Sequence, residues 1–187
     1  QLMLSMLRLQ QRRLPSGSSE HQMLGAASAR LYTMALVHEQ IYEKQGLTSL
    51  NFQQFVRLLV REVSAYEQGV HPVCKFEIDE VPLGVDEAIV CSLILNEWLR
   101  NAYQHAFSGV ENPLLSIVLG LSPSADGQAE PRAFIRVTDN GVGFDTEATQ
   151  ASQGMGLALS RHWARQLSGE ISMTSTQAGT VCLFTFP

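Results

Sequence analysis

The sequence predicts a helical N-terminal module followed by an α/β or α+β domain. Apolar residues recur at helical spacing through about the first 70 residues, whereas strand-like segments and helices alternate after them. The charge changes at the same point: residues 1–70 carry seven Lys and Arg against five Asp and Glu, and residues 71–187 carry six against thirteen. The length of 187 residues fits one large domain, or one domain with a helical appendage.

The composition is that of an ordinary soluble globular protein, with 45% hydrophobic and 17% charged residues. The net charge of -5 argues against general nucleic-acid binding, which needs a basic face. The longest uncharged apolar run, Ala88–Leu95, is too short to cross a bilayer, and the apolar start Gln1–Leu9 lacks the features of a signal peptide. Cys74, Cys91 and Cys182 are too far apart for a zinc site or a disulfide framework, so we expect reduced thiols packed as small hydrophobes.

The N-terminal module is expected to be an antiparallel helical hairpin. Apolar residues at helical spacing predict helices over Gln1–Leu14 and Glu20–Lys44. Pro15–Ser19 interrupts the pattern, and Ser18 or Ser19 can cap the second helix. Two helices joined by so short a turn lie side by side.

The remaining elements follow from local signals. Asn51 can cap a third helix, Phe52–Gln68, and Ser122–Pro131 has the composition of a loop. Strands are indicated by alternation or by short apolar runs, and further helices by longer apolar stretches. In chain order these are strand Cys74–Ile78, helix Asp86–Phe107, strands Leu114–Leu121 and Ala133–Thr138, helix Gly154–Leu167, and a closing hairpin of Glu170–Ser175 and Thr180–Phe186.

The predicted helix Asp86–Phe107 carries a line of polar residues where a core face would be apolar. Glu97, Asn101, Gln104 and His105 follow at i, i+4, i+7 and i+8, so they share one face. A carboxylate one turn from a carboxamide can hold a hydrated Mg²⁺, which prefers hard oxygen ligands. The alternatives are a solvated polar stripe and, for His105, a structural histidine at a helix end.

A glycine-containing loop follows the strand that ends near Thr138. Gly141 and Gly143 allow the backbone to approach a planar ligand closely. Asp139 could accept a hydrogen bond from an exocyclic amine such as that of adenine. Asp-Asn-Gly is also a common turn sequence, so a plain turn stays open here.

A second glycine pair, Gly154 and Gly156, opens a helix, where N–H groups and the helix dipole favour a phosphate. The pattern is not the dinucleotide fingerprint, because the third glycine is missing and the order of elements differs. It is not a P-loop either, since no Gly-Lys-Ser/Thr occurs.

Taken in order, these motifs resemble the GHKL ATPase family, which includes gyrase, the MutL repair proteins, heat-shock chaperones and sensor histidine kinases. Leu95–Phe107 is similar to the N box of histidine kinases, Asp139–Phe144 to their G1 box and Gly154–Leu159 to their G2 box. Gly179–Thr180, in the final predicted strand, completes the order of motifs that resembles this family. The resemblance covers residues 71–187 and implies an ATP-binding site.

The N-terminal part resembles one histidine-kinase branch in particular. Met34–Tyr42 is similar to its second dimerisation helix, and Gln1–Gln10 to the sequence that follows its His-Arg-x-Lys-Asn-Asn-Leu segment. In that branch the phosphoacceptor histidine begins this segment, so the alignment places the acceptor just before Gln1. The resemblance gives the acceptor role to neither His21 nor His38.

The resemblance also implies roles for the polar residues. Asn101 would coordinate the Mg²⁺ that bridges the nucleotide phosphates, and Glu97 would orient or activate the reacting group. His105 would contact phosphate or hold the N-box helix in place. Such roles suit phosphoryl transfer, which depends on positioning and charge neutralisation more than on covalent work by the protein.

For the base and phosphates, the implied roles fall on the glycine loops. Asp139 would bind the adenine amino group directly and through a water that Thr180 joins. Gly141 and Gly143 would shape the adenine pocket. Gly154 and Gly156 would present N–H groups to the phosphates.

Two departures from the family pattern bear on affinity. Many related N boxes have a lysine where this chain has Gln104, so a cationic phosphate contact is lost unless Arg100 or Arg161 replaces it. The lid between Asp139 and Gly154 is short, contains no Lys or Arg, and carries Asp145 and Glu147. We therefore expect weak to moderate nucleotide affinity and a mobile lid.

The resemblance implies an α+β chain. Residues 1–46 would form a dimerisation hairpin, and residues 47–187 a two-layer α/β sandwich with a mixed, mainly antiparallel sheet and helices on one face. We expect a homodimer through the hairpin and no nucleic-acid or membrane contact in this segment. Its location would be cytoplasmic, with or without a membrane anchor upstream in the parent protein.

The expected activity is that of a sensor histidine kinase core, which uses Mg-ATP to phosphorylate a histidine and passes the phosphoryl group to an aspartate of a response regulator. Two alternatives remain at this point. One is a histidine phosphotransfer or docking protein with a degenerate ATPase domain, and the other is an anti-sigma-type serine kinase. The phosphorylated product distinguishes them.

Overall fold

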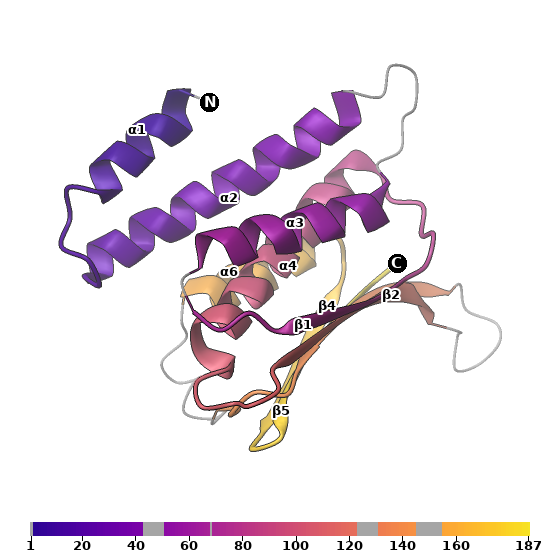
Figure 1. Cartoon of the computed structure of the whole chain (residues 1–187). Helices are drawn as coiled ribbons and strands as arrows, with labels where there is room; N and C mark the ends of the chain where they lie inside the picture. Colours follow the sequence, from indigo (N-terminus) through magenta and orange to yellow (C-terminus); the bar gives the residue numbers. More distant parts are fainter. Residues whose placement is uncertain (1, 43–50, 68, 123–130, 145–154) are drawn as a thin grey trace.

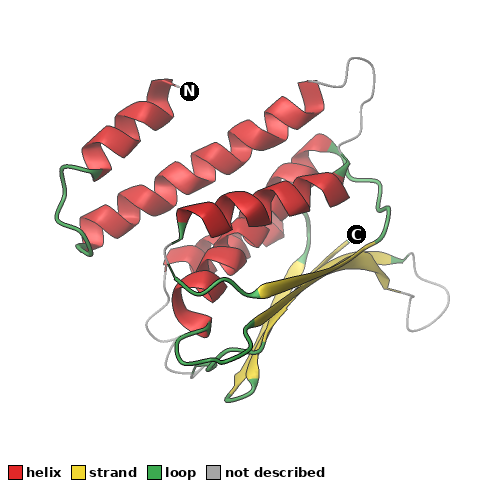
Figure 2. Ribbon diagram, in the orientation of Figure 1, coloured by secondary structure: helices red, strands yellow, loops and turns green. Residues whose placement is uncertain are grey.

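The structure is a computed structural model that describes residues 2–42, 51–67, 69–122, 131–144 and 155–187. A helical hairpin leads into a domain in which helices cover one face of a five-stranded sheet (Figures 1 and 2). The opposite face of the described sheet has no helix on it (Figure 2). The predicted α+β sandwich with an N-terminal hairpin is confirmed.

The hairpin consists of α1 (Leu2–Gln11) and α2 (Ser19–Tyr42), which lie side by side. The cap predicted at the start of the second helix is present, since the backbone N–H of His21 donates to Ser18 Oγ at 3.2 Å. The first helix ends three residues earlier than predicted. The predicted end of the second helix, at Lys44, lies outside the described residues.

Helix α3 (Phe52–Tyr66) begins as predicted, because Asn51 Oδ1 accepts the backbone N–H of Gln54 at 3.0 Å. Its buried face holds Phe55 and Leu59, at 0% and 1% exposure. This face packs on the next helix and joins the core between the helices and the sheet.

The helix predicted over Asp86–Phe107 is interrupted near its end. Helix α4 (Val85–Asn101) continues into a π-helical turn, η1 (Ala102–Ala106). Such wide turns occur mostly as single insertions in α-helices and are frequent at functional sites. Here the turn brings the carbonyl of Ala106 to the loop after the third strand, where it accepts the N–H of Val142 at 2.9 Å.

The sheet has the order β1-β2-β3-β5-β4. Strand β1 runs parallel to β2, and all other neighbours are antiparallel, as predicted for a mixed, mainly antiparallel sheet. Its strands are β1 (Val73–Ile78), β2 (Leu114–Ser122), β3 (Arg132–Asp139), β4 (Glu170–Thr176) and β5 (Gly179–Phe186).

Helix α6 (Met155–Gln166) packs on α4 and β4 and completes the helical layer. The core between the layers includes Leu99, Ile117 and Phe184, all at most 1% exposed. Each such side chain contributes about 1.5–3 kcal/mol by its burial, which makes the domain a rigid support for the loops at the edge of the sheet.

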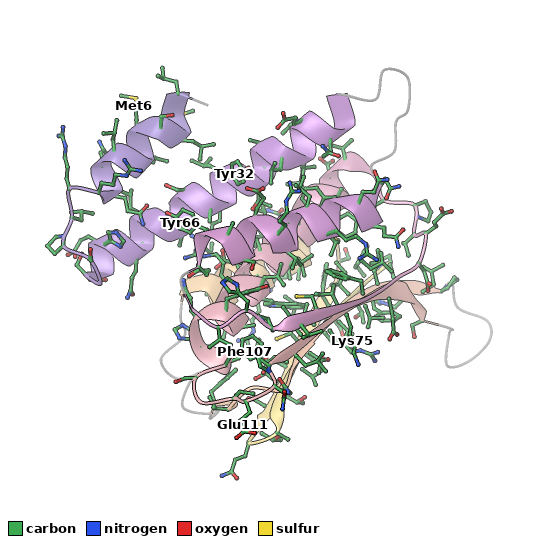
Figure 3. All side chains as sticks on the ribbon, in the orientation of Figure 1. Met6, Tyr32, Tyr66, Lys75, Phe107 and Glu111 are labelled. Atoms are coloured by element: carbon green, nitrogen blue, oxygen red, sulfur yellow. The ribbon has the colours of Figure 1, made fainter. Side chains whose placement is uncertain are left out.

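The hairpin packs against the domain through α2, which contacts both α3 and α4. Val37 of α2 is fully buried. Tyr32 lies between α2 and α3, where its hydroxyl donates to Glu62 Oε2 at 3.0 Å (Figure 3). Tyr66 at the end of α3 donates to Gln11 Oε1 at 3.1 Å, so both helices of the hairpin are tied to the domain.

The opposite side of the hairpin leaves large apolar side chains in solvent, Met6 among them (Figure 3). On α1 these are Leu2, Met3, Met6 and Leu9, and on α2 Met23 and Leu31. An exposed apolar face of this kind is typical of a protein interface. None of the described helices has the length and apolar character needed to span a membrane.

Candidate functional site

A cavity of about 280 Å³ opens between the N-box helix, α6 and the sheet, close to the lower end of the range for ligand pockets. Its wall combines apolar side chains with a few polar groups that come from separate motifs. The polar and glycine positions among its lining are Asn101, His105, Asp139, Gly143, Gly156 and Thr180. Six residues singled out in the sequence thus lie around one space.

Asp139, at the end of β3, is 9% exposed and supplies the only carboxylate among the lining residues that the structure describes. Its Oδ1 accepts two backbone N–H groups, from Gly141 at 2.9 Å and from Thr180 at 3.2 Å. Burial raises the pKa of Asp139, and the two hydrogen bonds act in the opposite direction. Because both donors bind Oδ1, Oδ2 is left to accept a hydrogen bond from a ligand.

Thr180 belongs to a short polar chain beside this carboxylate. Its hydroxyl lies 3.0 Å from Ser175 Oγ, which in turn accepts the backbone N–H of Phe144 at 2.9 Å. Ser175 was not among the predicted site residues. The β4–β5 hairpin pairs it directly with Thr180, so the strand register was the signal that could have found it.

The two glycines after Asp139 are required by close contacts. A Cβ on Gly141 would lie 2.4 Å from the carbonyl oxygen of Ala106, and one on Gly143 would lie 1.9 Å from that of Thr176. Gly143 also has a φ of +66°, which side chains disfavour. The loop therefore folds against η1 on one side and the β4–β5 turn on the other. Gly143 lines the cavity, whereas Gly141 shapes the loop from behind.

Asn101 and His105 face the cavity from the last turn of α4 and from η1. Trp98 lies one turn earlier on the same face and also lines the cavity. It is 2% exposed, and its indole Nε1 has no hydrogen-bond partner in the described part of the protein. Trp98 was missed in the sequence, although its spacing from Asn101 and His105 places it on their face.

Glu97 does not line the cavity but stands directly behind it. Its carboxylate forms two hydrogen bonds with the guanidinium of Arg30 in α2, Nε to Oε1 at 2.9 Å and Nη2 to Oε2 at 3.0 Å. A Cβ on Gly156, which does line the cavity, would lie 2.6 Å from Oε2. Arg30 thus holds both oxygens of Glu97 in this structure, and the role expected for Glu97 stays a prediction.

The cationic substitutes expected for the missing lysine do not reach the cavity. Arg100 Nε and Gln104 Nε2 both bind Glu67 at the end of α3, at 3.1 and 2.9 Å. These two side chains point toward α3, and Arg161 on α6 is not among the cavity residues. The geometry therefore gives no support to Arg100, Gln104 or Arg161 as phosphate contacts.

The matching family models cover both parts of the chain. A model described as histidine kinase matches residues 1–66. A second, described as histidine kinase-, DNA gyrase B- and HSP90-like ATPase, matches residues 87–187, which is more than half of the chain. The chain belongs to this ATPase family. With the kinase model before it, it carries the catalytic core of a two-component sensor histidine kinase.

Solved structures agree with this assignment at the level of the fold. The histidine kinase domain of the blue-light activated kinase EL346 from Erythrobacter litoralis is 19% identical, with a TM-score of 0.73 over 100% of this chain and 84% of that one. The histidine kinase AdeS from Acinetobacter baumannii is 16% identical, with a TM-score of 0.62 over 89% of this chain and 79% of that one. No curated protein sequence matches the chain.

The ATPase assignment implies that the kinase core binds ATP. The predicted family, fold and histidine-kinase character are confirmed. The predicted boundary between residues 46 and 47 stays a prediction, and so do the individual roles of the site residues. Gly154, predicted to contact phosphate, lies outside the described residues.

A divalent cation in this kinase core would depend mainly on the nucleotide. The described residues contain no group of three or more His, Cys, Asp or Glu side chains that could hold a metal. Asn101 offers one amide oxygen at the cavity. That fits Mg²⁺, which typically keeps several waters and takes phosphate oxygens as ligands beside one or two protein groups.

Proposed function

We propose that the kinase core binds Mg-ATP in the cavity between α4, α6 and the sheet and transfers the γ-phosphoryl group to a histidine, from which an aspartate of a response regulator takes it. One observation carries the proposal. Asp139, Asn101 and Gly156 come from three separate sequence motifs and line a single cavity. Each supplies a different kind of contact that ATP requires.

Asp139 is proposed to recognise the adenine. Its Oδ2 accepts the exocyclic amine, while the polar chain of Thr180 and Ser175 holds a water beside it. The apolar walls at Val137 and Met173 fit a planar base. Because the carboxylate is buried, a base that presents an acceptor instead of an amine would leave it unpaired and be rejected.

The phosphates are proposed to lie toward α6 and Asn101. The N-terminal turn of α6 offers N–H groups and the positive end of the helix dipole, and Gly156 lets a ligand approach that turn. Asn101 would hold the Mg²⁺, which neutralises phosphate charge when bound. His105 lies on the same wall and is proposed to contact the phosphate chain.

The acceptor is proposed to be a histidine that residues 1–187 do not include. His21 lies at the start of α2 and His38 on its exposed surface. The exposed apolar face of the hairpin would pair two copies of the chain into a helical bundle. Since ATP is found in the cytoplasm, the proposal places the kinase core there.

The chemistry of the phosphorylated product tests this proposal. We expect the parent protein that contains this segment to incorporate γ-phosphate from Mg-ATP as acid-labile, base-stable phosphohistidine. Residues 1–187 alone should hydrolyse or bind ATP without being labelled. Acid-stable phosphoserine on a partner would indicate the serine-kinase alternative, and a label on His21 or His38 would refute the proposed acceptor.

A further inference from the structure

The ion pair between Arg30 and Glu97 joins the two parts of the kinase at a buried position. The arginine and glutamate side chains are 14% and 6% exposed, and both carboxylate oxygens are bound. The Arg30 guanidinium also lies 6.0 Å from the ring of Trp163 in α6. One residue of the hairpin therefore contacts both helices, α4 and α6, that form the cavity.

The pair lies against the part of the cavity that is proposed to hold phosphate. Glu97 is one helical turn before Asn101, the proposed Mg²⁺ ligand. Its Oε2 occupies the space that a side chain on Gly156 would fill, at 2.6 Å from the position of that Cβ. Because Gly156 also lines the cavity, this carboxylate lies close behind the cavity wall at the first turn of α6.

The charge at this end of the cavity depends on Arg30. A buried carboxylate without a partner would repel the triphosphate at low effective dielectric constant. Among the described residues Arg30 is the only ion-pair partner of Glu97, and Arg100 is bound by Glu67 instead. Removing the guanidinium would therefore place one negative charge behind the phosphate site.

We infer that Arg30 is a positioning residue of the ATP site, which neutralises Glu97 and so allows the phosphate end to accept nucleotide. The inference rests on the proposed function and deepens it, because it makes the hairpin part of the nucleotide site. Docking of α2 and binding of ATP then favour each other, since coupling between two sites is reciprocal. A displacement of α2 that withdraws Arg30 lowers the affinity for ATP.

The test compares ligands with and without phosphates. Binding of ATP and of adenosine is measured by NMR titration for the unaltered chain, Arg30→Gln, Glu97→Gln and the double variant. We expect Arg30→Gln to weaken ATP binding roughly tenfold, the scale of one uncompensated charge near a phosphate chain. Glu97→Gln should strengthen ATP binding, because Arg30 then keeps a free positive charge. The ATP affinity of the double variant should be close to that of the unaltered chain. Adenosine affinity should not change in any of them.

Arg61→Gln is the matched control, since it also removes one positive charge, but from a side chain on α3 that is 74% exposed. It should leave both affinities unchanged. If Arg30→Gln does not fold, the opposite shift expected for Glu97→Gln still decides the question. The inference would be overturned, with the ATP site left intact, if Arg30→Gln lost ATP and adenosine affinity equally. It would also be overturned if the double variant bound ATP as weakly as Arg30→Gln does. Absence of ATP binding by the unaltered chain would overturn both this inference and the proposed function.

Discussion

The backbone N–H of Thr180 donates to the same carboxylate oxygen of Asp139 that accepts the N–H of Gly141. Asp139 and Thr180 are also register partners, so their contact joins the end of β3 to the start of β5. It fixes which oxygen of Asp139 is used by the protein. The other oxygen, Oδ2, is the one that we propose for adenine, and the arrangement buries a charged group.

That burial predicts an effect of pH on stability. The pKa of Asp139 is raised above its ordinary value of 3.8, mainly by burial, so the folded chain holds this proton more tightly than the unfolded chain. The stability that the proton provides is complete below the unfolded pKa and is lost as pH rises through the folded pKa. Asp139→Asn should therefore be more stable than the unaltered chain at neutral pH.

Urea unfolding at about pH 7 and about pH 4 measures this difference, which should shrink at the lower pH as Asp139 becomes protonated. Asp79→Asn, at an exposed carboxylate, is the control and should change little. A clear loss of stability in Asp139→Asn at neutral pH would show that the ionised carboxylate holds the loop together instead of straining it.

Gly143 is predicted to tolerate no side chain. Gly143→Ala would place a Cβ 1.9 Å from the carbonyl oxygen of Thr176 at a φ of +66°. We expect a loss of about 2 kcal/mol or more in the free energy of unfolding, together with weaker ATP binding as the loop moves. Gly109→Ala has a similar φ of +76° but open space around it, and should cost less. Equal costs would mean that backbone strain alone, without the clash, decides the effect.

Tryptophan fluorescence should report on the cavity. Trp98 lines it, while Trp163, the other tryptophan of the chain, does not. We expect ATP to change the emission of the unaltered chain and of Trp163→Phe, and to leave that of Trp98→Phe almost unchanged. A response that follows Trp163 instead would place the ligand outside the described cavity.

Arg100 is predicted to act on structure and not on nucleotide. It is bound by Glu67 away from the cavity, so Arg100→Gln should change ATP affinity by no more than about twofold. The same change should destabilise the fold by about 1–2 kcal/mol, because Glu67 loses a partly buried partner. Calorimetry and denaturant unfolding measure the two effects. A large loss of ATP affinity at unchanged stability would restore Arg100 as a phosphate contact.

Ser28 gives a prediction for the packing between hairpin and domain. Its hydroxyl is buried without a hydrogen-bond partner among the described residues and lines a cavity of about 60 Å³ that also borders Asn96. Ser28→Ala should leave the free energy of unfolding unchanged or raise it by up to about 1 kcal/mol. A loss of more than that would indicate a bound water that joins Ser28 to Asn96.

Most elements could be predicted because their signals are local. The Asn51 and Ser18 caps, the apolar periodicity of the helices and the alternation in the strands all lie within a few residues. The family motifs likewise identified the residues around the cavity, since each is a short pattern. The π-helical turn carried no such signal, because a periodic apolar stretch reads the same whether its last turn is α or π.

The charge partners could not be predicted, because they depend on tertiary packing. Arg30 and Glu97 are 67 residues apart, and no pattern in either helix indicates their pairing. Glu67 similarly binds Arg100, which was expected to substitute for the missing phosphate-binding lysine, and Gln104, which stands in the place of that lysine. The direction of a side chain at a helix surface depends on which residue packs beside it, and local sequence patterns do not show which residue that is.

Calorimetric titration with ATP, with and without Mg²⁺, tests the central proposal most directly when the unaltered chain is compared with Asp139→Asn and Asp79→Asn. The Asn side chain can still accept the N–H groups of Gly141 and Thr180, but it offers no second acceptor to adenine. We predict Mg²⁺-dependent binding that is lost in Asp139→Asn and kept in Asp79→Asn. Binding that survives in Asp139→Asn would contradict the placement of adenine against this carboxylate, and with it the proposed nucleotide site.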